Sequence, residues 1–217
     1  AGTQLTNRQR ALEKLDADLH SFLMAKEALP RGERELAVNA AKAIRRCWLD
    51  KRESTLTLGF HNRWSTRAQT SVLPLLSADF SHVRELHLDS VEWTADADAF
   101  LSGFANLETL KINNSTLERL PPKVSEMSRL KTLDLQENKL QLDQQSATTL
   151  GALKHLTRID LAKNPLKVLP DFSAMAGLDY LDLSHTGISD WPKGLQENTP
   201  WLYLNLSHNH LKAVPEA

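Results

Sequence analysis

The amino-acid sequence predicts an α/β solenoid, in which short parallel strands stack into one curved sheet and a helical hairpin caps its N-terminal end. Three observations support this fold class. Apolar residues recur in a fixed pattern over the last two thirds of the chain, the pattern returns at a nearly constant interval, and the residues before it follow a helical period instead. We therefore expect a hairpin cap at residues 1–53 and a solenoid at residues 54–217.

The recurring pattern is Leu-x-x-Leu-x-Leu-x-x-Asn-x-Leu, and other aliphatic residues replace leucine in some copies. Its clearest copy has Leu133 as the second apolar residue and Asn138 as the asparagine, and a degenerate first copy has Leu56 and Leu58. The residues equivalent to Leu133 in the other copies are Leu86, Leu110, Ile159, Leu181 and Leu204. The intervals of 22–26 residues between them are typical of leucine-rich repeats.

Each copy is expected to form one short strand followed by a turn. The paired apolar residues point to one side of the strand, and the asparagine side chain bonds the backbone of the turn. One repeat buries about five aliphatic side chains at roughly 2 kcal/mol each. Ordering a residue costs about 1–2 kcal/mol of backbone entropy. A single repeat is therefore unstable alone, and stacking on neighbours is required.

The connections between strands carry their own signals. Leu-Pro or a similar pair follows several strands, at 120–121, 169–170, 191–192 and 214–215. Proline suits the convex side, where no ladder donor is needed. The longer intervals predict helices at 95–104, where Thr94 is a candidate N-cap, and at 142–153.

The first fifty residues show a helical period. One apolar stripe comprises Leu12, Leu15, Leu19, Phe22 and Leu23, and a second comprises Leu36, Ala40, Ala43, Ile44, Cys47 and Trp48. The segment 30–32 (PRG) separates the two. We expect a hairpin that covers the apolar end of the solenoid.

Composition excludes several classes of function. The 26 basic and 27 acidic side chains do not favour nucleic acid as a partner, since such proteins present concentrated positive charge. One cysteine cannot form an internal disulfide, and no apolar run is long enough to span a membrane. The chain starts without methionine or a signal peptide and ends without a capping element, so we expect an excised fragment of a longer protein, and a monomer.

The side chains between the paired leucines are expected to face the concave side of the sheet. This column reads Thr57, His87, Lys111, Asp134, Asp160, Asp182 and Asn205. Its central carboxylates, Asp134, Asp160 and Asp182, are candidate contacts for a protein partner. A merely solvated column is the alternative interpretation, because aspartate is common at this position of leucine-rich repeats.

The last two copies contain nearly identical strings, YLDLSH at 180–185 and YLNLSH at 203–208. Tyr180 should therefore stack beside Tyr203, with His185 and His208 in the same patch. Tyrosine is favoured at binding hot spots. The alternative is stacking between the two strands without any partner.

No catalytic or cofactor site is expected. Two histidines without a third ligand make a poor zinc site. Cys47 lies on an apolar helical stripe, which favours a buried structural thiol over a nucleophile, although Arg45 and Arg46 precede it. The sequence has no glycine-rich phosphate loop and no nucleophile elbow.

Over roughly residues 31–217, the chain resembles the leucine-rich-repeat region of bacterial type III effectors that carry a novel E3 ubiquitin ligase (NEL) domain. The likeness rests on the segment 78–86 (ADFSHVREL), the Leu-Pro endings and the segment 186–192 (TGISDWP). It implies secretion into a host cell, activity in the host cytoplasm and a catalytic domain C-terminal to this chain. The ligase cysteine belongs to a Cys-x-Asp motif, which Cys47 does not match, so the resemblance assigns no catalytic residue here.

These observations favour a protein-binding module that recruits a host protein on its concave face. The expected contacts are Asp134, Asp160, Tyr180, Asp182, His185, Tyr203, Asn205 and His208. Two alternatives remain: a regulatory domain that docks on the catalytic domain of the same protein, and a structural interaction scaffold.

Overall fold

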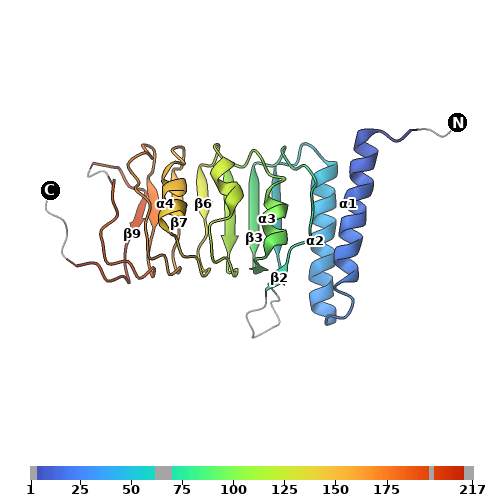
Figure 1. Ribbon diagram of the computed structural model, residues 1–217, viewed down its shortest axis with the longest axis horizontal. Coiled ribbons are helices and arrows are strands. Elements are labelled where there is room, and N and C mark those ends of the chain that lie inside the picture. The colour runs from blue at the N-terminus through green and yellow to red at the C-terminus, as the bar shows by residue number, and fades with distance from the viewer. Residues whose placement is uncertain (1–3, 62–69, 196–197, 213–217) are drawn as a thin grey trace.

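The computed structural model describes residues 4–61, 70–195 and 198–212, and it begins with two long helices that pack side by side (Figure 1). Helix α1 spans Asn7–Met24, and Thr6 caps it in a reciprocal capping box with Gln9. Helix α2 spans Arg31–Leu49 and follows Pro30. Together they form the expected hairpin, and α2 lies against the first strand of the solenoid.

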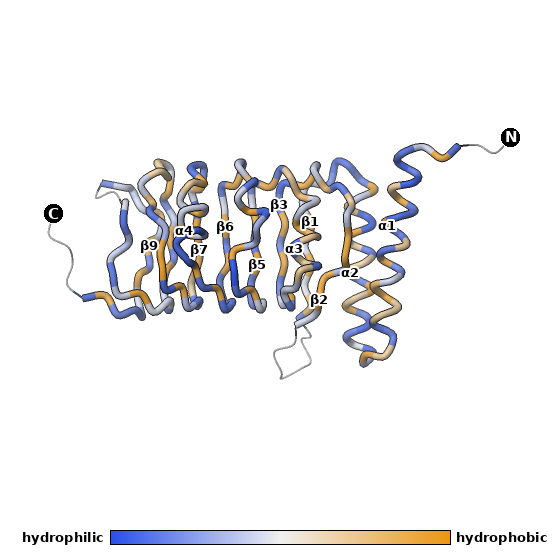
Figure 2. Tube along the Cα trace, in the orientation of Figure 1, coloured by the Kyte–Doolittle hydropathy of each residue, from blue (hydrophilic) through white to orange (hydrophobic). Residues whose placement is uncertain are grey.

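Seven parallel strands form the main sheet in the order β1-β3-β5-β6-β7-β8-β9. The strands are β1 (Thr55–Gly59), β3 (Glu85–Asp89), β5 (Thr109–Asn113), β6 (Thr132–Asp134), β7 (Arg158–Asp160), β8 (Tyr180–Asp182) and β9 (Tyr203–Asn205). The equivalent leucines pair in register from Leu56 through Leu86, Leu110, Leu133, Ile159 and Leu181 to Leu204. The predicted solenoid is thus confirmed, and Figure 2 shows the hydrophobic stretches recurring from strand to strand.

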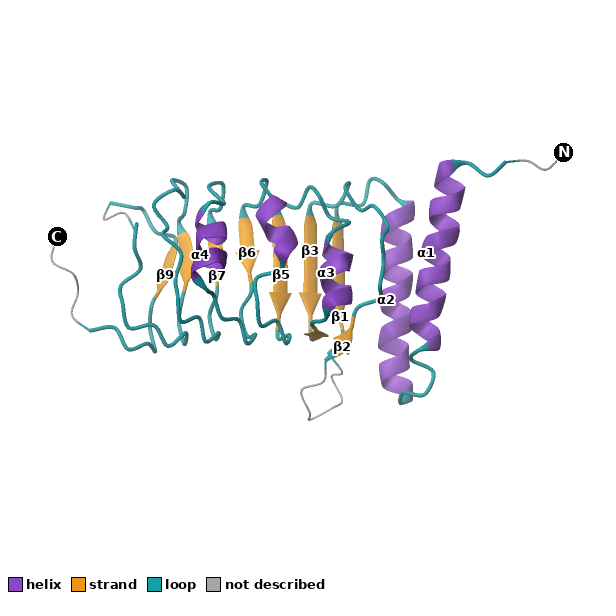
Figure 3. Ribbon diagram, in the orientation of Figure 1, coloured by secondary structure: helices purple, strands orange, loops and turns teal. Residues whose placement is uncertain are grey.

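Helices lie on one side of this sheet, as Figure 3 shows. They are α3 (Ala95–Leu101), the 3-10 helix η1 (Pro122–Glu126) and α4 (Gln144–Gly151), and a small sheet pairs β2 (Ser71–Val72) with β4 (Val91–Glu92). Within the described residues, no helix is both long and apolar enough to cross a membrane.

The two predicted connecting helices exist but are shorter than expected. Helix α3 ends at Leu101 because the chain turns at Gly103, where a Cβ atom would lie 2.3 Å from the carbonyl oxygen of Ala78. Thr94 occupies the N-cap position, yet its hydroxyl makes no capping bond and is buried without a partner. Helix α4 is capped by Asp143 and Ser146 in a reciprocal box. The predicted pair at 214–215 lies outside the described residues.

The motif asparagines connect successive repeats. Asn164 is 1% exposed, and its amide nitrogen donates to the carbonyl oxygens of Leu135, Leu161 and Ala162 while its oxygen accepts from the backbone N–H of Leu140. Asn138 and Asn209 make the same kind of contacts in their repeats. The predicted turn role of the motif asparagine is confirmed, and each of these side chains also reaches the preceding repeat.

The last rung of the sheet is less covered than the others. The equivalent leucines or isoleucine of β3, β5, β6, β7 and β8 are fully buried, whereas Leu204 in β9 is 40% exposed and Leu202 is 78% exposed. The edge of β9 that faces away from β8 pairs with no described strand. Aliphatic side chains that elsewhere form the core therefore reach the surface at this end.

Candidate functional site on the open sheet face

The face of the main sheet that α3, η1 and α4 leave uncovered is here called the open face. Its first row comprises Thr55, Glu85, Thr109, Thr132, Arg158, Tyr180 and Tyr203, and its second row comprises Thr57, His87, Lys111, Asp134, Asp160, Asp182 and Asn205. The second row is the column that the sequence predicted. Because pairing is in register, each side chain has a direct neighbour on the next strand.

Tyr180 and Tyr203 lie at the C-terminal end of the first row. Their rings stack with centroids 4.7 Å apart and an interplanar angle of 18°, as the repeated YL(D/N)LSH strings predicted. The Tyr203 hydroxyl accepts a bond from the Asn205 amide at 3.0 Å and lies 3.5 Å from an Asp182 carboxylate oxygen. These contacts fix the ring of Tyr203, which is nevertheless 39% exposed.

The first row also contains a residue that sequence reasoning missed. The Arg158 guanidinium lies 4.0 Å from the centre of the Tyr180 ring, on the β7 side of the tyrosine pair. The Arg158 side chain makes no hydrogen bond or ion pair with any described residue, and its Nε is buried without a partner. The sequence did contain a signal for this position. Arg158 lies two residues before Asp160, just as Tyr180 lies two residues before Asp182.

The carboxylates of the second row are not solvated. Asp134, Asp160 and Asp182 are only 4%, 5% and 9% exposed, so the solvated-column interpretation is wrong for them. The Oδ1 atom of each accepts the backbone N–H two residues ahead, at 3.2, 3.0 and 2.9 Å, and Asn205 makes the same bond. Such bonds shape the turn after the strand. Contact with a partner stays a prediction for these residues.

The environment of Asp160 changes the pKa of its carboxyl group. Burial raises its pKa from 3.8 to about 6, and the neighbouring Asp134 and Asp182 carboxylates add to the rise. The backbone N–H of Ala162 and the charge of Arg158 act in the opposite direction. The ionised form is therefore disfavoured in the folded protein.

Replacing Asp160 with asparagine is expected to raise the free energy of unfolding at pH 7.5 by about 1–2 kcal/mol, since the amide keeps an acceptor for Ala162 and removes the charge. The folded pKa exceeds the unfolded one, so the penalty of ionisation is absent below about pH 4, develops up to about pH 6 and is constant above it. Urea unfolding at pH 4.5 and 7.5 measures this dependence. A gain of equal size at both pH values would contradict it, and exposed Asp96 changed to asparagine is the control.

His185 and His208 lie in the turns that follow β8 and β9. Their rings stack at 4.1 Å with an interplanar angle of 10°, both side chains are exposed, and both residues have positive φ angles of 54° and 56°. The equivalent turn residues of earlier repeats, Ser90, Asn114, Glu137 and Lys163, also have positive φ. The histidines thus form a pair of their own in the turns after β8 and β9, whereas the tyrosines stack at the start of these strands.

Cys47 is 3% exposed in α2, and burial raises the pKa of its thiol to about 11, which agrees with the predicted buried structural thiol. Within the described ranges, no three His, Cys, Asp or Glu side chains are grouped to hold a metal ion.

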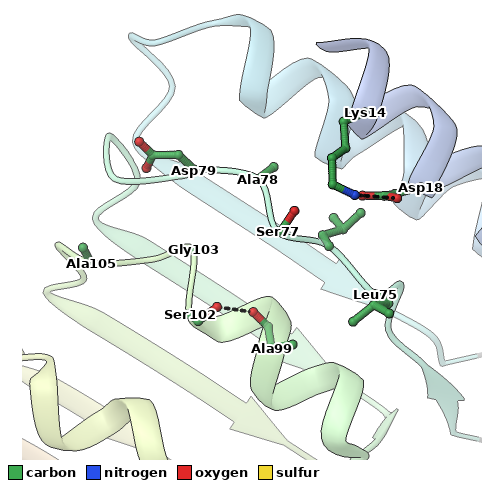
Figure 4. A pocket seen from close by; sticks show the side chains of 11 residues that line it. Lys14, Asp18, Leu75, Ser77, Ala78, Asp79, Ala99, Ser102, Gly103 and Ala105 are labelled. Atoms are coloured by element: carbon green, nitrogen blue, oxygen red, sulfur yellow. Dashed lines mark hydrogen bonds and ion pairs between the residues drawn. The ribbon is translucent and has the colours of Figure 1, made fainter. Parts of the chain in front are cut away.

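A hollow of about 500 Å³ lies away from the open face, between α1 and the segments 75–79 and 99–105 (Figure 4). Lys14 and Asp18 at its rim pair with each other at 3.2 Å, and Ser102 bonds the carbonyl oxygen of Ala99. The charged pair and the hydroxyl are thus already engaged by the chain itself.

Known proteins share this architecture. The leucine rich repeat family model matches residues 81–140 and 128–188. Keratocan of Danio rerio is 31% identical in an alignment over 137 residues that covers 51% of this chain and 39% of the keratocan. Fibromodulin of Sus scrofa is 30% identical in an alignment over 108 residues that covers 49% of this chain and 71% of that sequence.

Two bacterial structures are similar in fold. YopM from Yersinia enterocolitica WA-314 matches 95% of this chain and 39% of its own, with a TM-score of 0.63 and 21% identity. The leucine-rich repeat domain of the type III effector XopL matches 99% and 84%, with a TM-score of 0.56 and 18% identity. The chain thus spans about two fifths of YopM and of the keratocan. Together, the in-register repeats and these matches show that the chain belongs to the leucine-rich-repeat family.

Proposed function

We propose that this chain binds a folded partner protein on the open face of its sheet, which corresponds to the concave face of a leucine-rich-repeat solenoid. Leucine-rich repeats generally serve as protein-interaction modules. The observation that carries the proposal here is the stacked pair Tyr180–Tyr203, whose outer ring is exposed yet held by Asp182 and Asn205. A fixed aromatic surface loses little conformational entropy on binding.

The partner in this proposal is a host protein, and the chain is the recognition module of a secreted bacterial effector acting in the host cytoplasm. The fold likeness to YopM and to the type III effector XopL supports this part. The proposed contacts are Asp134, Asp160, Tyr180, Asp182, His185, Tyr203, Asn205 and His208.

Changing Tyr180 and Tyr203 together to alanine should weaken partner binding by about tenfold or more, because alanine removes both rings of the stack. Quantitative mass spectrometry of pull-downs from a eukaryotic cell lysate identifies candidates, and titration of each purified candidate measures affinity. A matched double variant, Gln144→Ala with Gln145→Ala, changes exposed residues of α4 on the opposite side of the sheet. Equal retention by wild type and the tyrosine variant, with unchanged urea midpoints, would contradict the proposal.

The exposed aliphatic residues of the last rung favour a second candidate function. Leu202 and Leu204 at the open edge suit docking on a catalytic domain of the same polypeptide, which the resemblance to ligase effectors implies. Such a parent protein would conjugate ubiquitin while this chain alone would not. Incubating this chain with ubiquitin and activating and conjugating enzymes tests that division, since chain formation by the fragment would overturn it.

A further inference from the structure

Asp160 differs from the aspartates beside it on the second row of the open face. Its Oδ1 accepts the backbone N–H of Ala162 at 3.0 Å, whereas its Oδ2 accepts no hydrogen bond from any described residue and is not fully buried. The Oδ2 atoms of Asp134 and Asp182 each have a side-chain partner within 3.5 Å. In the repeat before, that partner is Gln136, at the position where β7 is followed by Ala162, which has no side-chain donor. The row thus contains one acceptor that the chain itself leaves free.

The same strand presents a donor without a partner. Arg158 precedes Asp160 by two residues, so both side chains lie on the same face of β7. The Arg158 guanidinium lies 4.0 Å from the centre of the Tyr180 ring, which fixes its position, and its Nε is buried without a hydrogen bond. Its charge opposes the rise in the pKa of Asp160 that burial causes, so the two groups are neighbours, yet they form no ion pair within the described residues. Strands β6 and β8 flank both groups, which places them in the interior of the sheet.

These two groups together restrict the chemistry of a ligand. A partner that covers them removes water from both, and a group left unpaired then raises the free energy of the complex. A carboxylate would pair with Arg158, but it would meet the aspartates of three adjacent strands, Asp134, Asp160 and Asp182. An ammonium group would pair with Asp160, but it would leave the Arg158 donors without an acceptor and place two cations together. A neutral group that both accepts and donates avoids these costs.

We infer that β7 receives the side-chain carboxamide of an asparagine or glutamine of the partner protein, with its oxygen on Arg158 and its amide nitrogen on the Oδ2 of Asp160. A primary carboxamide presents its oxygen and one N–H on the same edge. In a trans peptide group the C=O and the N–H point in opposite directions, so one main-chain amide does not meet both groups. The inference rests on the proposed function and names the partner's chemistry at that site.

Four small probes test this chemistry without the partner. They are propionamide, N-methylpropionamide, propionate and propylammonium, each titrated at pH 7.5 and constant ionic strength. The chain contains only two tyrosines, so protein labelled with ¹³C-tyrosine gives ring signals from Tyr180 and Tyr203 alone, and Tyr203→Phe assigns them. Tyr180 reports on the site because its ring lies against the Arg158 guanidinium.

We expect propionamide to shift the Tyr180 signals with an affinity about threefold to tenfold higher than that of each other probe, because it alone pairs with both groups. Arg158→Gln and Asp160→Asn should each remove this preference, since the first removes the guanidinium and the second replaces the free acceptor with a donor. The matched changes Arg129→Gln and Asp96→Asn, at exposed positions, should preserve it. Urea midpoints show that each variant is folded.

Several results would overturn the inference. Equal affinities for propionamide and N-methylpropionamide, or no shift of Tyr180 with any probe, would show that the two groups do not act together. A preference for propionate or propylammonium would assign the site to a charged group of the partner. A preference for propionamide that survives Asp160→Asn would place the amide elsewhere.

The outcome is separable from that of the proposed function. If the probes show no carboxamide preference while the double tyrosine variant still loses its partner, the inference is wrong and binding through the open face stands. If the double variant keeps its partner, the proposed function fails regardless of the probe titration.

Discussion

Replacing Asn164 with alanine is expected to lower the free energy of unfolding by about 2–4 kcal/mol. The side chain is 1% exposed and joins two repeats through three donated bonds and one accepted bond. Alanine leaves the buried N–H of Leu140 without its acceptor, whereas the carbonyl oxygen of Leu135 keeps its bond from Asn138. An unpaired buried polar group loses its contact with water and gains nothing in return.

Urea unfolding followed by circular dichroism measures this loss. Asn39→Ala, at an exposed position of α2, is the matched control and should change the free energy by less than about 0.5 kcal/mol. A similarly small effect at Asn164 would show that water replaces the amide, and would contradict the connecting role given to it.

The second large effect is expected at Leu181, where alanine should lower the free energy of unfolding by about 2–5 kcal/mol. Leu181 is fully buried between Ile159 and Leu204 in the sheet. The equivalent change at Leu204, which is 40% exposed, should lower it by only about 1 kcal/mol, since less surface is removed from water in the folded state.

The two leucine variants control for each other because they change the same residue type at the same register position of adjacent strands. Comparison of urea midpoints and m-values gives both effects. Equal losses at Leu181 and Leu204 would mean that the last rung is as well covered as the rungs before it, and the docking function proposed for this end would lose its support.

The repeat pattern predicted the strands of the main sheet and their register, because these depend on local alternation of apolar residues and on a constant interval. The helical period of the first fifty residues predicted the hairpin. Helix ends were predicted less well. The end of α3 at Leu101 depends on the close approach of Gly103 to the carbonyl oxygen of Ala78, which belongs to a segment far away in the sequence.

At the candidate site, the stack of Tyr180 on Tyr203 followed from two nearly identical strings one repeat apart. The burial of Asp134, Asp160 and Asp182 did not, since it depends on neighbours in adjacent strands and on turns that the carboxylates themselves shape. Arg158 escaped notice because cation and ring lie 22 residues apart and share no repeated string.

The unbroken register from Leu56 to Leu204 has an evolutionary consequence. Duplication or deletion of one whole unit of about 23 residues lengthens or shortens the sheet by a single step of about 4.8 Å and leaves the geometry of the remaining units intact. The number of repeats therefore sets the length of the sheet, and substitutions outside the core set the chemistry of its surface. These two properties can change independently.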